Sequence, residues 1–311
     1  MTKKLFIVFS FLILGQSLTF AEGLKTPGTA GFPFLKIGFA ARPQALNGNF
    51  SALSDDVSAF EYNPAGLASM RGSQYNFTHV ALFDNDVTAD AFMLGIGFGN
   101  NAVGLSAKTL KAKDFTTTLG DVSGVETVTQ TTELGLSDNN ISIGFARNFP
   151  VNEYSSSEIK AGFAINSITE KLDTTQNTAL CADIGLLYFI KSSGSRWGVA
   201  VQNVGSTSGP DVLPITLRAG TGFLSKEFNS SLDVVQAIDS KVKIGLGLEI
   251  PVQKVFILRF GGSYQQGLNF SAGFGFDFKY LKLDYAYTPN SDLDTSTRIS
   301  LSIDLTPHKD D

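Results

Sequence analysis

Hydrophobic and polar residues alternate along most of the chain with a period of two. In the segment 268–278, apolar side chains occupy every second position, and Gly, Ser, Asn or Asp occupy the positions between them. The segments 241–250 and 297–305 repeat this split, with isolated charged residues on the polar side. Successive side chains of a β-strand point to opposite faces, so each segment predicts a strand with one apolar and one polar face.

Fourteen segments carry this pattern or a weaker form of it. The expected strands cover residues 73–83, 89–98, 102–112, 139–149, 158–168, 179–190, 196–204, 215–224, 230–237, 241–250, 255–264, 268–278, 280–287 and 297–305. Connections after odd-numbered strands are mostly longer than those after even-numbered strands, and the segment 113–138 is the longest. Bacterial outer-membrane barrels have an even strand number, short periplasmic turns and longer outer loops.

A soluble β-sandwich would also alternate, but three features favour a membrane barrel. Most expected strands have about nine to eleven residues, enough to cross a bilayer when tilted. Their polar faces combine small residues with charges of both signs, and aromatic residues cluster near strand ends. The sequence therefore predicts an all-β membrane protein, a 14-stranded antiparallel outer-membrane β-barrel over residues 73–305, with a C-terminal tail at 306–311.

The first 21 residues have the pattern of a secretory signal peptide. Lys3 and Lys4 precede the apolar run 5–14, and Thr19-Phe20-Ala21 provides a small-x-small cleavage site. A membrane anchor is the alternative, but the run is shorter than the roughly 20 residues of a spanning helix. We expect export, and the barrel pattern then points to the outer membrane of a diderm bacterium.

Residues 22–72 do not alternate, and they contain Gly, Pro and short stretches of helical character. Side chains fill an eight-stranded barrel and 16 to 18 strands leave a water channel, so an intermediate interior needs filling. We expect a short, partly helical N-terminal hatch or plug. Ser54, Asp55 and Asp56 resemble a capped helix start, and Asn63-Pro64-Ala65-Gly66 predicts the end of that helix.

These residues resemble a known family. The motifs are Phe34-Leu35-Lys36-Ile37-Gly38, Ala41-Arg42, Ala52-Leu53-Ser54-Asp55-Asp56-Val57-Ser58-Ala59 and Tyr62-Asn63-Pro64-Ala65-Gly66-Leu67. They resemble the PorV/PorQ family, which is related to the FadL long-chain fatty acid transporters. The resemblance implies a fourteen-stranded barrel with an N-terminal hatch that contains the Asn-Pro-Ala element. The hatch or gate candidates are Asn63, Pro64, Ala65, Gly66, Asp55, Asp56 and Arg42. Many relatives have Met-Gly-Gly where this chain has Leu46-Asn47-Gly48-Asn49.

Composition argues against an enzyme and against nucleic acid as a partner. The chain has two His, one Cys and a net charge of −5 without basic blocks. His79 and His308 are far apart, His79 is expected to be an interfacial strand residue, and Cys181 a buried structural thiol. Asp55 and Asp56 could serve as an acid–base pair, but helix capping is the favoured interpretation. The sequence predicts no catalytic residue, no metal and no cofactor.

Charged residues on the polar strand faces form a second group of candidates. They are Lys160, Asp183, Arg218, Lys241, Lys243, Arg259, Lys282, Asp284, Arg298 and Asp304. In a narrow lumen, we expect them to pair with one another or with the plug, because unpaired burial is costly. The alternative is that some bind the carboxylate headgroup of a ligand, for which Arg is well shaped.

These patterns leave three functions open. The leading hypothesis is passive outer-membrane uptake of hydrophobic small molecules such as long-chain fatty acids, a substrate class that the FadL resemblance implies. The second is a PorV-like accessory role in a type 9-like secretion system, with secretion-system proteins and outer-membrane lipid as partners. The third is a structural surface barrel. The 113–138 loop is either a solvated surface loop or an apolar capture surface.

Overall fold

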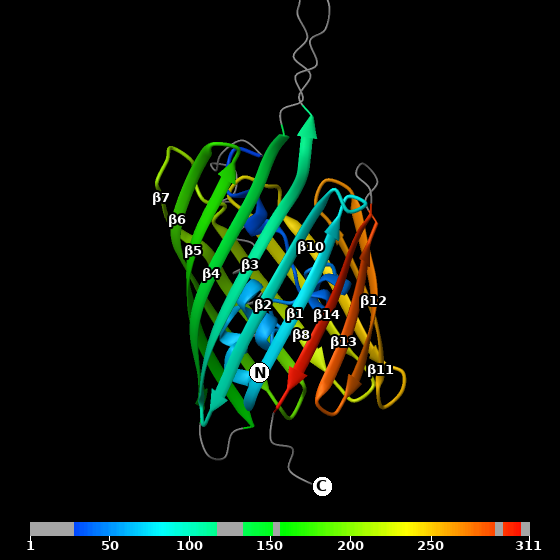
Figure 1. Cartoon of the computed structure of the whole chain (residues 1–311). Coiled ribbons are helices and arrows are strands. Elements are labelled where there is room, and N and C mark those ends of the chain that lie inside the picture. Colours follow the sequence, from blue (N-terminus) through cyan, green and yellow to red (C-terminus); the bar gives the residue numbers. More distant parts are fainter. Residues whose placement is uncertain (1–27, 117–132, 152–155, 290–294, 306–311) are drawn as a thin grey trace, which may run out of the picture.

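The computed structural model describes residues 28–116, 133–151, 156–289 and 295–305. Fourteen antiparallel strands form one closed barrel, in which each strand pairs with its sequence neighbours and β1 pairs with β14 (Figure 1). The strands are β1 (Gly72–Leu82), β2 (Val87–Phe98), β3 (Asn101–Thr116), β4 (Glu133–Pro150), β5 (Ser157–Leu172), β6 (Thr175–Ile190), β7 (Ser195–Thr207), β8 (Thr216–Leu224), β9 (Asn229–Ala237), β10 (Lys243–Pro251), β11 (Phe256–Tyr264), β12 (Leu268–Phe278), β13 (Leu281–Thr288) and β14 (Ser296–Asp304). The predicted 14-stranded antiparallel barrel is confirmed.

The apolar and polar positions that alternate in the sequence lie on opposite faces of the barrel wall. Large apolar side chains point outward, among them Ile143 on β4, which is 65% exposed, and Leu246 on β10, which is 63% exposed. Polar and small residues of the same strands point into the lumen, as with Ser142 and Gly247. An apolar exterior matches the hydrocarbon layer of a membrane, and a polar interior is typical of outer-membrane barrels.

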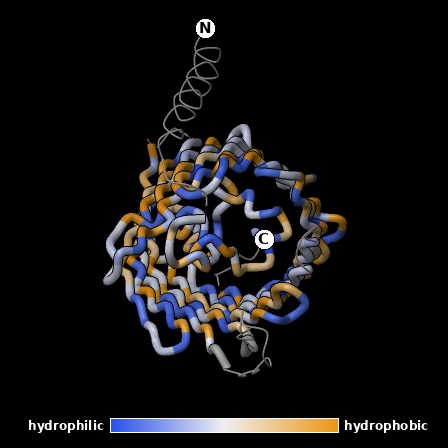
Figure 2. Tube along the Cα trace, turned by 90° about the horizontal axis from the view of Figure 1, so that it is seen from above, coloured by the Kyte–Doolittle hydropathy of each residue, from blue (hydrophilic) through white to orange (hydrophobic). Residues whose placement is uncertain are grey.

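Residues 28–71 lie inside the ring of strands, and we name them the inner segment (Figure 2). They form the short helices η2 (Pro33–Lys36), α2 (Ala41–Ala45), η3 (Val57–Glu61) and η4 (Pro64–Ser69). No helix among residues 28–116, 133–151, 156–289 and 295–305 is long and apolar enough to cross a membrane.

The inner segment runs through the lumen from one end of the barrel to the other. The connections that follow odd-numbered strands lie at one end of the barrel, which we name the loop end. The opposite end, where β1 begins, is named the turn end. Gly28 and Gly31 donate backbone hydrogen bonds to Asp239 and Val212 in two loop-end connections. The segment then descends to Gly72, which pairs with Gly97 on β2 at the turn end.

Four neighbouring strands are much longer than the sequence pattern suggested. β3, β4, β5 and β6 have 16, 18, 16 and 16 residues, and β3 and β4 rise above the rest of the wall in Figure 1. The expected boundaries of the 113–138 connection are therefore wrong, because β3 continues to Thr116 and β4 begins at Glu133. The expectations for its central part fall on residues 117–132, outside the described residues.

The physical reason is a change of surroundings along these strands. Outward residues of β5 are apolar up to Ile165 and then become Ser167, Thr169 and Lys171. The pairing with β4 continues past this point to Leu172, because backbone hydrogen bonds hold a strand together in water as well as in lipid. Apolar alternation predicts only the part of a strand that faces hydrocarbon.

The short helices also differ from expectation at one boundary. Asp56 caps η3 as expected, with its side chain accepting a hydrogen bond from the Ser58 backbone N–H. Pro64, Ala65 and Gly66, which were expected to end this helix, instead begin a second one, η4. Asn63 is the N-cap of η4. Pro64 is favourable in the first turn, because proline has no backbone N–H and the N–H groups of a first turn have no partner within the helix.

Candidate functional site

Two cavities of similar volume lie beside the inner segment, one nearer each end of the lumen. The loop-end cavity has a volume of about 450 Å³ and is lined by residues such as Ile37, Tyr62 and Arg218. The turn-end cavity also has a volume of about 450 Å³ and is lined by residues such as Arg42 and Glu249. The candidate site is therefore the inner segment with the wall residues that hold it and the two cavities beside it.

Two buried asparagines attach the inner segment to the wall backbone. The Asn63 amide nitrogen donates to the Leu186 carbonyl of β6 at 3.1 Å and to the Ser51 carbonyl at 3.0 Å. The Asn49 amide nitrogen donates to the carbonyls of Leu246 on β10 at 2.9 Å and of Gly262 on β11 at 3.1 Å. Both side chains bond to carbonyls of the sheet, so they fix the inner segment to two separate parts of the wall.

Glycines on the inner wall make room for these contacts. An added Cβ would collide with the Asn63 side chain at Gly185 and with the Asn49 side chain at Gly245. At four further wall glycines, it would meet backbone atoms of the inner segment: Gly97, Gly162, Gly198 and Gly261. The small residues of the polar strand faces thus provide the surface on which the inner segment packs.

Other wall side chains bind backbone N–H groups of the inner segment. The Asp233 carboxylate on β9 accepts from the Ser51 N–H at 2.8 Å, and the Ser300 hydroxyl on β14 accepts from the Ala41 N–H at 2.9 Å. Within the segment, one oxygen of Glu61 accepts from the N–H groups of Phe39 and Ala40, both at 3.0 Å. These bonds satisfy donors that short helices leave unpaired.

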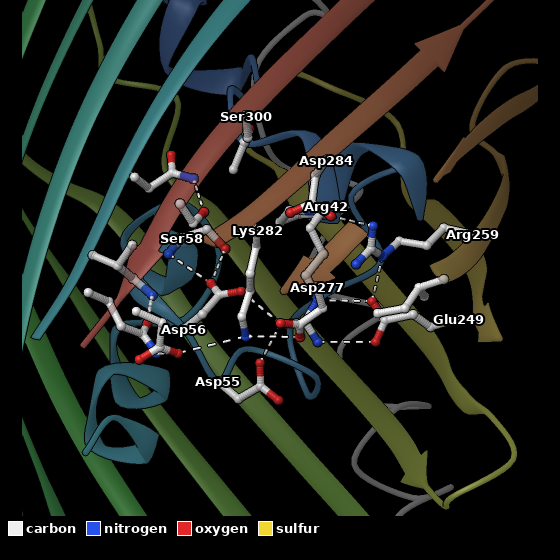
Figure 3. A pocket seen from close by; sticks show the side chains of 18 of the residues that line it. Arg42, Asp55, Asp56, Ser58, Glu249, Arg259, Asp277, Lys282, Asp284 and Ser300 are labelled. Carbon is white, nitrogen blue, oxygen red and sulfur yellow. Dashed lines mark hydrogen bonds and ion pairs between the residues drawn. The ribbon is translucent and has the colours of Figure 1, made fainter. Parts of the chain in front are cut away.

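Arg42 is the centre of a charge network at the turn-end cavity (Figure 3). Its guanidinium lies 2.7 Å from Asp55 and from Asp56 in the inner segment, and 2.9 Å from Glu249 on β10. Glu249 also pairs with Arg259 at 2.7 Å. The network therefore joins three of the predicted hatch residues to the barrel wall.

Two further pairs extend this network. Arg259 bonds to Asp284 on β13 at 2.7 Å, and Arg196 on β7 lies 3.4 Å from Asp55. Burial by itself would raise the pKa of Asp55, but the charges of Arg42 and Arg196 outweigh it and lower this pKa below its usual range. Asp55 is therefore a carboxylate at neutral pH.

Two of the other candidate lumen residues make separate contacts. Lys160 on β5 donates to the Ser69 hydroxyl of the inner segment at 2.8 Å and lies 3.6 Å from Glu158. Asp183 on β6 accepts from the Asn203 N–H at 2.7 Å, where β7 bulges and Asn203 has a φ of 62°. Asp183 therefore supports a wall irregularity.

Three candidate cations line the loop-end cavity instead. They are Arg218 on β8, Lys243 on β10 and Arg298 on β14. Each donates to a neutral oxygen: Arg218 to the Gln202 side chain at 2.6 Å, Lys243 to the Asn47 carbonyl and Arg298 to the Gly38 carbonyl at 2.9 Å. The lumen charges thus separate into an ion-paired group at the turn end and a cationic group at the loop end.

Of the residues considered for catalysis, Asp55 and Asp56 line the turn-end cavity as part of the charge network, whereas His79 and Cys181 lie apart from both cavities. His79 points outward from β1 and is hydrogen-bonded to Asp90 of β2 at 2.8 Å, and Cys181 on β6 is buried. In the described ranges of the chain, no three His, Cys, Asp or Glu residues are grouped as a metal site would require. The chemical features of the site are therefore two cavities with charged linings and the inner segment that lies between them.

Several contributors to the site carried no recognisable signal in the sequence. Asn49 and Asp233 are isolated polar residues, and Glu249 is one charge on an alternating strand face. Only their contacts with the inner segment distinguish them from other lumen residues. The predicted hatch residues, in contrast, form an ordered motif that could be recognised.

The closed fourteen-stranded barrel with its inner segment has the same fold as several solved FadL-like barrels. The toluene transporter TodX of P. putida matches 87% of this chain and 99% of its own with a TM-score of 0.66, at 11% identity. The Ralstonia pickettii toluene transporter TbuX matches 86% and 98% with a TM-score of 0.61, at 14% identity. A Pseudomonas aeruginosa FadL homologue matches 90% and 99% with a TM-score of 0.52, at 12% identity. The TM-scores show a shared fold, and at identities of 11–14% the likeness extends to the fold alone.

The chain belongs to the Uncharacterised protein family (UPF0164), which it matches over residues 17–246. A UPF0164 protein of Treponema pallidum (strain Nichols) is 48% identical over 44 residues, a segment that spans 14% of this chain and 14% of the relative. The FadL-like architecture expected from the sequence is thus present in the structure, and the family is UPF0164.

Proposed function

We propose that this protein is a passive outer-membrane channel for hydrophobic small molecules such as long-chain fatty acids, closed at rest by the inner segment acting as a hatch. The observation that carries the proposal is the position of the inner segment, which reaches from the loop end to the turn end of the lumen and lies between two cavities. Two similar barrels are described as toluene transporters, which supports an apolar solute.

Under this proposal, the loop end faces the outside of a diderm bacterium, and residues 1–21 direct export. Short turns normally face the periplasm, and the longest connection, residues 117–132, follows an odd-numbered strand. A solute would enter the loop-end cavity and pass the hatch residues Asn63, Pro64, Ala65 and Gly66 to reach the turn-end cavity. No cofactor or energy source is required, because the solute moves down its gradient.

The test combines pore conductance with solute uptake. The intact protein in a planar bilayer should show no wide, stable pore, and deletion of residues 28–71 should open one. Heat-dependent migration of the deletion variant on a gel controls for barrel formation. Cells producing the intact protein should accumulate labelled oleate faster than cells without it. A wide pore in the intact protein would refute the hatch, and unchanged oleate uptake would refute the solute class.

A second candidate function is a PorV-like accessory role in secretion, and the long strands favour it. A 16-residue strand tilted by about 40° rises about 40 Å, whereas the apolar band of such barrels is about 25 Å tall. The polar outer face of β5 beyond Ile165 would therefore stand in water and could bind another protein. Native mass spectrometry after gentle extraction separates the candidates. A lone barrel with a small adduct supports uptake, and a large complex supports the accessory role.

A further inference from the structure

The three loop-end cations have no carboxylate partner in the described part of the chain. Arg218, Lys243 and Arg298 form no ion pair within 4.0 Å there, although all three line the same cavity. Two other charged residues of this lining, in contrast, are paired. Lys36 lies 2.8 Å from Asp239, and Glu61 lies 3.3 Å from Lys108.

Arg298 provides an independent sign of a missing ligand. The residue is only 5% exposed, and its terminal nitrogen Nη1 is buried without any hydrogen-bond partner. Its Nε is already used by the Gly38 carbonyl at 2.9 Å. A buried guanidinium nitrogen without an acceptor is costly, so an acceptor on a ligand would stabilise it.

The cations gather around the tyrosine at the centre of the inner segment. The Arg218 guanidinium lies 5.1 Å from the centre of the Tyr62 ring. Gly48 lies close to both Tyr62 and Lys243, since a Cβ placed there would be 3.6 Å from each side chain. Arg298 interacts electrostatically with Tyr62 and Glu61. The positive groups therefore converge on one region of the cavity.

Counting charges indicates which ligand this region fits. Two carboxylates act electrostatically on these cations from outside the cavity lining: Asp233 acts on Arg218 and Lys243, and Asp183 acts on Arg218. Neither forms an ion pair with them, so a ligand with a single negative charge would leave two of the three lining cations without a charged partner in the cavity. The same cavity has an apolar side formed by Leu35, Ile37, Leu82 and Phe83. At about 450 Å³, it has the volume of an ordinary small-molecule site.

We propose that the loop-end cavity binds a small organic anion that carries two negative charges on an apolar body, as an organic phosphate or a dicarboxylate does. Arg218, Lys243 and Arg298 bind the charged group, with Arg298 Nη1 donating to it. Leu35, Ile37, Leu82 and Phe83 contact the apolar body. This goes beyond the proposed function, since neither an uncharged hydrocarbon nor the single carboxylate of a fatty acid would pair with all three cations. Binding at this site also requires no transport.

Four probes of similar size but different charge test the proposal by isothermal titration calorimetry of the full chain in a non-ionic detergent at pH 7. They are phenyl phosphate, phthalate, benzoate and benzyl alcohol. We expect the two dianions to bind more tightly than benzoate, and benzyl alcohol to bind weakest. The better of phenyl phosphate and phthalate then identifies the phosphate or dicarboxylate chemistry. Equal binding of all four probes would overturn the proposal and leave the hydrophobic channel intact.

Variants connect the binding to these residues. Arg298→Gln should weaken binding of the dianion at least about tenfold, because charge-assisted hydrogen bonds contribute about 1.5–3 kcal/mol. Arg71→Gln, which removes one exposed charge at the turn end, should leave binding unchanged. Arg298→Lys should retain part of the affinity. Since Arg298 also holds Gly38, Lys243→Met tests the site without that contact. Unchanged affinity in both Arg298→Gln and Lys243→Met would refute the site.

Discussion

At the scale of single residues, the inner segment is held by side-chain amides that bond to wall carbonyls opposite glycines. Asn63 faces Gly185 and Asn49 faces Gly245. In each pair, the asparagine of the inner segment fits against a wall glycine that is distant in the sequence. Alternation predicted which face of each strand carries these glycines. It could not predict which glycine lies opposite which asparagine, because that depends on the path of the inner segment through the lumen.

Replacing Asn63 by Ala should loosen the inner segment while leaving the barrel closed. The change removes both donors to Ser51 and Leu186, and leaving buried carbonyls unpaired costs about 1–3 kcal/mol. Hydrogen exchange of amides in η4 should accelerate accordingly. Asn139→Ala is the matched control, since Asn139 is exposed on β4. Equal exchange in the two variants would contradict the role of Asn63.

At the scale of elements, the inner segment was predictable as an element but its internal boundaries were not. Its lack of alternation set it apart from the strands, and Asp56 was recognisable as a cap. The break between η3 and η4 was missed, because Asn63-Pro64 both ends one helix and starts another. The ion pairs of Arg42 with Asp55 and Glu249, which we name the charge anchor, were predictable only in part. Arg42 and Asp55 were candidates from the sequence, whereas only the contact with Arg42 distinguishes Glu249 from other lumen charges.

This anchor predicts how the inner segment responds to acid. Because the pKa of Asp55 is lowered in the folded protein, its ion pairs stabilise the seated segment fully above the usual Asp pKa of about 4, and this contribution is lost as the pH falls through the lowered value. In planar bilayers, channel openings of the intact protein should become more frequent as the pH falls below about 4. Asp55→Asn should open more often at pH 7 and respond less to acid. Identical pH profiles would exclude Asp55 from the anchor.

At the scale of the whole molecule, the closed barrel of fourteen strands was predictable because lipid and lumen impose opposite chemistry on alternate residues. The extra length of β3 to β6 was not, because the outward residues become polar along these strands, as on β5 beyond Ile165, and the apolar alternation ends there. The separation of the lumen charges into a turn-end group and a loop-end group could not be predicted from the sequence either. Sequence places Arg218 and Arg259 on the same kind of face, and only the path of the inner segment puts them in different cavities.

The proposed orientation can be checked with single cysteines. The native Cys181 is buried, so it should give little background labelling. Ser208→Cys in an exposed loop-end connection should react with a membrane-impermeant maleimide on intact cells. Ser193→Cys in an exposed turn-end connection should react only after the outer membrane is opened. The reverse result would mean that the loop end faces the periplasm.

The contacts of β14 have a consequence for biogenesis. This last strand completes the cylinder by pairing with β1, and through Ser300 and Arg298 it also holds Ala41 and Gly38 of the inner segment. The partners are separated by more than 250 residues, so these are among the most non-local contacts of the chain. Barrel closure and the last wall contacts of the inner segment are therefore both completed by β14, and a nascent chain that has not yet added this strand lacks both.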